Sequence, residues 1–72
     1  MNYTIIEQQT TNGTTAVLTF VENEYFAALA KYFDKCAAGA RSNVPRHAVT
    51  LLNERGDKVK YECFDHEQNA EE

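Results

Sequence analysis

Two cysteines and two histidines are the side chains best suited to hold a metal ion or to form a nucleophile with its base. They are Cys36, Cys63, His47 and His66. Cys63 with His47 is the candidate catalytic dyad, because a thiol nucleophile needs a neighbouring base. Structural zinc sites usually take ligands in close pairs such as Cys-x-x-Cys, and the chain has no such pair. We therefore expect no enzyme, metal or cofactor, and keep a metal or redox site at Cys36 and Cys63 as an alternative.

Basic and aromatic side chains near the C-terminus raise the question of nucleic-acid binding. Lys58, Lys60 and Phe64 share one side of an expected strand. Single-stranded nucleic acid is bound by such combinations of positive charge and stacking rings. The formal net charge of −4 and the pI of about 5.0 oppose this, because binding to phosphates depends on positive charge. Nucleic-acid binding is therefore the alternative rather than the leading hypothesis.

The negative charge is concentrated at the C-terminal end. Residues 65–72 hold four acids and no base, which leaves seven acids and seven bases in residues 1–64. A polar segment of this kind buries too little apolar surface to offset its ordering entropy. We expect one domain over residues 1–64 and a disordered acidic tail over residues 65–72, since 72 residues suit a single domain.

The chain lacks the sequence features of a membrane span or a leader. Its apolar runs are far shorter than the about 18 residues that a spanning helix needs. The start, MNYTIIEQQ, has neither a basic region nor a long apolar region. We therefore expect a cytoplasmic protein that does not bind membranes, with both cysteines as buried free thiols rather than a disulfide.

Two hairpins are indicated by turn residues. Asn12-Gly13 is a strong two-residue turn signal, and it pairs residues 3–9 with 15–21, with Ile5 opposite Phe20. A second turn surrounds Gly56 and admits two registers. A three-residue loop places Leu51 opposite Val59, whereas a two-residue turn places Leu51 opposite Lys60. We adopt the three-residue loop, because it gathers Val49, Leu51, Val59, Tyr61 and Cys63 on one side of the hairpin.

One helix is expected between the hairpins, over residues 24–38. Asn23 can cap its start, and Gly39 is expected to end it. Helical spacing predicts a single sheet-facing stripe, made up of Phe26, Leu29, Ala30, Phe33, Ala37 and Ala40.

The expected fold is α+β in the order ββαββ, with a four-stranded sheet covered on one face by the helix. Hairpin, helix and hairpin in this order resemble the β-grasp arrangement of small immunoglobulin-binding domains. That resemblance is in element order only, and it implies parallel first and last strands at the centre of the sheet. An all-antiparallel sheet of the same elements is the alternative.

The uncovered face of this sheet is the candidate functional surface. Apolar side chains among polar ones on such a face suggest contact with another macromolecule. We expect a small binding module that contacts a protein partner or a second copy of itself, with single-stranded nucleic acid as the alternative ligand. The expected binding residues are Ile6, Val17, Val21, Leu52, Lys58, Lys60 and Phe64.

Overall fold

The N-terminal hairpin forms as its turn residues predict. The computed structural model describes residues 1–66, and in it β1 (Tyr3–Thr11) pairs antiparallel with β2 (Thr14–Glu22). Asn12 and Gly13 have φ values of 52° and 79°, as a two-residue hairpin turn with two positive φ angles requires. Ile5 lies opposite Phe20, so the predicted register is confirmed.

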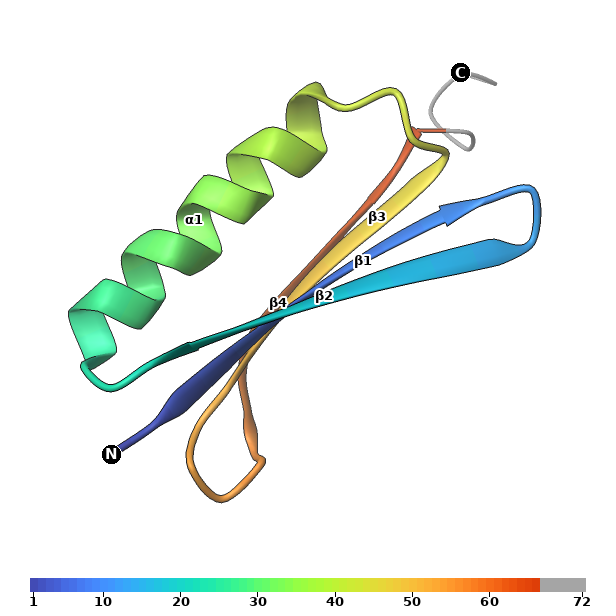
Figure 1. Ribbon diagram of the computed structural model, residues 1–72. Helices are drawn as coiled ribbons and strands as arrows, with labels where there is room; N and C mark the ends of the chain where they lie inside the picture. The colour runs from blue at the N-terminus through green and yellow to red at the C-terminus, as the bar shows by residue number, and fades with distance from the viewer. Residues whose placement is uncertain (67–72) are drawn as a thin grey trace.

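The sheet contains four strands in the order β2-β1-β3-β4. After helix α1 (Tyr25–Arg41), strand β3 (Arg46–Leu52) pairs with β1, and strand β4 (Lys58–Asp65) pairs with β3. Every pairing is antiparallel, so the all-antiparallel alternative is confirmed and the β-grasp resemblance does not extend to strand pairing. Figure 1 shows α1 lying along one face of the sheet.

The predicted register of the second hairpin is wrong. Leu51 lies opposite Lys60 rather than Val59, and a bulge falls between Leu51 and Leu52. The loop chemistry explains the difference, because the Asn53 Oδ1 atom accepts hydrogen bonds from the backbone N–H groups of Arg55 and Asp57 at 3.0 and 2.9 Å. A one-residue change of register moves every following side chain to the other face of the sheet. From Lys60 to Phe64, strand β4 therefore presents opposite faces from those predicted, whereas the bulge leaves Lys58 on its predicted side.

Helix α1 also differs from its prediction at both ends. It begins at Tyr25 after Glu24, whose side chain makes no capping hydrogen bond, and it continues through Gly39 to Arg41. Gly39 is buried because the helix approaches the sheet closely there. A Cβ atom at this position would lie 2.9 Å from Phe64 Cδ2 and 3.2 Å from the His47 ring. Gly39 is thus a packing residue and not the end of the helix.

The core lies between α1 and the sheet. Its fully packed apolar residues are Ile5, Ala28, Tyr32, Val49 and Leu51, with Tyr3, Phe20, Leu29 and Cys36 packed around them.

The predicted helical stripe is wrong except at Leu29, which packs against the core, because its two phenylalanines point away from the sheet. Phe26 is 72% exposed and Phe33 is 54% exposed, whereas Ala28, Tyr32 and Gly39 are the buried residues of α1. The helix is apolar on two sides, and the side that carries Ala28 and Gly39 faces the sheet, where Gly39 permits a close approach to Phe64 and His47.

The end of the folded part extends slightly further than the sequence predicts. Asp65 belongs to β4, and the His66 backbone N–H donates to the Pro45 carbonyl at 2.9 Å. The remainder of the predicted tail, residues 67–72, lies outside the described residues. Within residues 1–66, no helix has the length and apolar character needed to cross a membrane.

Candidate protein-binding face

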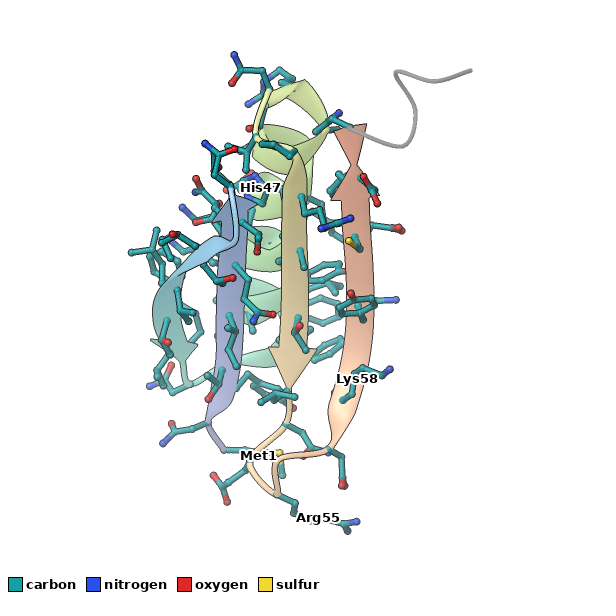
Figure 2. The ribbon with its side chains drawn as sticks, turned by 90° about the vertical axis from the view of Figure 1, so that its right-hand side faces the viewer. Met1, His47, Arg55 and Lys58 are labelled. Carbon is teal, nitrogen blue, oxygen red and sulfur yellow. The ribbon has the colours of Figure 1, made fainter. Side chains whose placement is uncertain are left out.

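The candidate site is the face of the sheet that points away from α1, which we call the open face. Figure 2 views the sheet from this side, with the helix behind it. The strand registers place side chains from all four strands on the open face. They are Thr4, Ile6, Gln8 and Thr10 of β1, Thr15, Val17, Thr19 and Val21 of β2, Arg46, Ala48, Thr50 and Leu52 of β3, and Lys58, Tyr61, Cys63 and Asp65 of β4.

Large apolar side chains on the open face are substantially exposed. Val17 is 55% exposed, Val21 is 60% exposed and Tyr61 is 50% exposed. Ile6 and Leu52 between them are partly buried. An antiparallel sheet with one solvated face normally presents polar side chains there. The open face instead combines apolar side chains with threonines, which is the composition of a contact surface.

Lys58 and Tyr61 form one charged corner of this face, and the ion pair of Arg46 and Asp65 lies at the other end of the same two strands. The Lys58 Nζ atom lies 5.3 Å from the centre of the Tyr61 ring, within cation–π distance. Figure 2 shows Lys58 near the start of β4. Partial burial raises the pKa of the Tyr61 hydroxyl, and the adjacent Cys63 thiol adds to the increase. This corner is the part of the open face best able to bind an acidic group.

Five of the seven predicted binding residues lie on the open face, and two do not. Lys60 and Phe64 lie on the side of β4 that faces α1, because Lys60 is opposite Leu51 and Phe64 is opposite His47. The contact between Phe64 and Gly39 agrees with this placement. Tyr61 and Cys63 of β4 lie on the open face instead of Lys60 and Phe64. Sequence reasoning missed these two because it chose the other register of the second hairpin.

A cluster of polar side chains lies between α1 and the sheet. His47 Nε2 is 2.7 Å from Glu7 Oε2, and Lys35 Nζ is 3.7 Å from Glu7 Oε1. Glu7 and His47 are 4% and 3% exposed, and His47 Nδ1 has no hydrogen-bond partner among residues 1–66. The tautomer with hydrogen on Nε2 fits this geometry, because it donates to Glu7 and leaves no buried N–H unpaired. The cluster joins β1, β3 and α1, and its role is to hold them together.

The cysteines do not come together with His47. Cys63 is exposed on the open face, so the prediction that it is buried is wrong, while Cys36 lies on α1 on the opposite side of the sheet. Burial raises the pKa of the Cys36 thiol, and burial likewise raises the pKa of Tyr32, its neighbour on the helix. Among residues 1–66, no three His, Cys, Asp or Glu side chains are grouped as metal ligands.

Comparisons with protein families, with curated proteins and with solved structures found no match for this chain.

Proposed function

We propose that the chain is a non-catalytic binding module that holds a protein partner on its open face. The observation that carries this proposal is the exposure of Val17, Val21 and Tyr61 on a sheet face that no element of residues 1–66 covers. Covering exposed apolar area contributes about 25 cal/mol per Å² to association before the costs of binding are subtracted. The same side chains contribute nothing comparable to the fold, because they lie outside the core.

The composition of the open face indicates a partner with an apolar surface. The open face carries two basic side chains, Lys58 and Arg46, and Arg46 is paired with Asp65 of the same face at 3.5 Å; its other polar groups are hydroxyls, amides and a thiol. A flat surface of this kind suits another sheet or the apolar side of a helix. Threonine hydroxyls between the apolar side chains can donate and accept hydrogen bonds at the rim.

Single-stranded nucleic acid is the weaker candidate. With Lys60 and Phe64 on the other side of β4, the open face keeps Lys58 and Tyr61 for phosphate and base contacts, and its Arg46 is paired with Asp65. Nucleic-acid affinity depends on several such contacts and falls steeply with salt. An apolar protein contact changes little over the same salt range, so salt dependence separates the two ligands.

The proposal is tested by capture from a nuclease-treated lysate with two matched variants. Val17→Glu places a charge on the open face, and Leu18→Glu places the same charge on the other side of the same strand. The two positions are 55% and 49% exposed, and circular dichroism checks that both variants stay folded, because Leu18 lies opposite Glu7. We expect a protein that wild type and Leu18→Glu retain and that Val17→Glu loses, with retention that persists at high salt. Equal retention by all three baits, or retention that depends on added nucleic acid, contradicts the proposal.

A further inference from the structure

The outer side of α1 carries a second exposed apolar surface, separate from the open face. We call it the outer stripe and define it as Phe26, Ala30, Phe33 and Ala37. All four residues are exposed, and the two phenylalanines are 72% and 54% exposed. Their spacing of four, three and four residues places them along one side of the helix, as in the seam of a coiled coil. Within residues 1–66, nothing covers this side.

We propose that a second copy of the chain covers the outer stripe, through antiparallel packing of the two α1 helices about a twofold axis. The order of large and small residues supports a second copy as the occupant. In an antiparallel pair centred between residues 31 and 32, Phe26 of each helix lies level with Ala37 of the other, and Phe33 lies level with Ala30. Each phenylalanine ring then packs against an alanine of the other helix, and the twofold axis repeats every such contact with the two copies exchanged.

A parallel pair does not give this fit. It would place phenylalanine opposite phenylalanine and alanine opposite alanine. The paired rings would be crowded, and the paired alanines would leave unfilled space between the helices. It would also bring like ends of the helices together. The large-small order therefore distinguishes the two directions.

The charges at the ends of α1 favour the antiparallel pair as well. Glu24 precedes the first turn and Arg41 is in the last turn, and neither side chain has an ion-pair partner among residues 1–66. Antiparallel packing brings the acidic end of one helix beside the basic end of the other. It also aligns the two helix dipoles in opposite directions, which is the favourable arrangement.

The two sheets would not collide in this dimer. At about 100° per residue, the outer stripe lies about 150° around the helix from the side that carries Ala28, Tyr32 and Gly39. That side faces the sheet, so the two sheets lie on diverging sides of the helix pair. Both open faces stay accessible, and the dimer would present two binding faces to its partners.

The area available indicates a reversible dimer. A phenylalanine side chain buries about 150–250 Å² when fully covered. The exposed parts of Phe26 and Phe33 therefore offer about 250 Å² in each copy, with smaller contributions from the alanines. The total stays below the about 1,200 Å² of a standard interface, so we expect a dimer that dissociates on dilution.

Sedimentation equilibrium over a range of concentrations tests this proposal with matched variants. We expect the mass of wild type to rise from 8.2 kDa toward that of two copies as the concentration approaches millimolar. Phe33→Glu should weaken the dimer at least tenfold, and Val17→Glu should leave it unchanged, although the two positions are 54% and 55% exposed. Circular dichroism checks that both variants stay folded, and Phe26→Glu is the second variant if one does not. A wild type that stays at 8.2 kDa, or a dimer that Val17→Glu removes and Phe33→Glu keeps, overturns the proposal.

Disulfide trapping tests the direction of the helices. In a background with Cys36→Ala and Cys63→Ser, one protein carries Phe26→Cys and the other carries Ala37→Cys. Each protein then has a single cysteine, so any disulfide joins two copies. Oxidation with diamide should link the copies when the two proteins are mixed. Linking of each protein to itself, with no increase on mixing, indicates a parallel pair and overturns the proposal.

Discussion

Replacing Glu7 with alanine is the most informative change to the fold, because it leaves His47 and Lys35 without their shared acceptor. Glu7 Oε2 is 2.7 Å from His47 Nε2, and Glu7 and His47 are nearly inaccessible to solvent. Removing one member of a buried polar pair costs about 3–5 kcal/mol, because the other member stays buried and unpaired. A domain of this size has about 3–5 kcal/mol of net stability, so Glu7→Ala should be largely unfolded at 25 °C.

Urea titration followed by circular dichroism measures this loss, with two comparison variants. Glu7→Gln keeps an acceptor for His47 and removes the charge that faces Lys35, so we expect a smaller loss of about 1–2 kcal/mol. Glu62→Ala removes an exposed carboxylate from β4 and should change the free energy of unfolding by less than about 0.5 kcal/mol. A loss below about 1 kcal/mol for Glu7→Ala would refute the reasoning that this cluster holds the elements together.

Three further outcomes follow from the packing and the ionisable groups. Gly39→Ala should lower the free energy of unfolding by about 1–3 kcal/mol in a urea titration, because the new methyl group would lie 2.9 Å from Phe64; an increase in stability would contradict that contact. The raised pKa values of Cys36 and Tyr32 mean that the folded state holds these protons more tightly than the unfolded chain does. Their contribution to stability is complete below the ordinary pKa values of 9.0 and 10.0 and is lost as the pH rises above them. The urea midpoint of unfolding should therefore fall as the pH rises above about 9, and it should fall less steeply in Tyr32→Phe. A urea midpoint that is unchanged at pH 11 would contradict this. Cys63 should react with a thiol reagent at pH 8 several times faster than Cys36, because it is exposed and Cys36 is not; equal rates would argue against these placements.

The first hairpin could be predicted because its register depends on local chemistry. Asn12-Gly13 adopts the two positive φ angles of a two-residue turn, and that turn fixes which residues are opposite each other. The second hairpin offered two registers with different loop lengths. Apolar alternation favoured the register that gathers Val59 and Tyr61 with Leu51, but the side-chain hydrogen bonds of Asn53 and the bulge after Leu51 produce the other one.

The orientation of the helix could not be read from periodicity alone. Helix α1 is apolar on two sides, and both sides satisfy helical spacing. The choice between them depends on how closely the helix can approach the sheet, which the small residues Ala28 and Gly39 decide. Glu7 was missed as a buried residue for a related reason. Glu7 shares a strand face with Ile5, and this alternation was the signal that could have indicated its burial. Its partner His47 lies 40 residues away in the sequence, so the pairing that permits the burial was not evident.

The open face could be predicted in part. Ile6, Val17, Val21 and Leu52 are placed there by the strands whose faces were assigned correctly. Lys60 and Phe64 were assigned to it through the wrong register of β4. The open face therefore carries one lysine instead of two, and its Arg46 is paired with Asp65, which favours a protein partner over nucleic acid.

The rate of Cys63 alkylation tests most directly whether a partner sits on the open face. Cys63 is an exposed thiol on that face, and Cys36→Ala removes the other thiol of the chain. The measurement compares the rate in the free protein with the rate in its complex with a captured partner. We expect the partner to slow alkylation at least tenfold, and we expect Val17→Glu, which should not bind, to react at the free rate in the presence of the partner. A partner that stays bound while Cys63 reacts at its free rate would show that binding occurs elsewhere on the molecule.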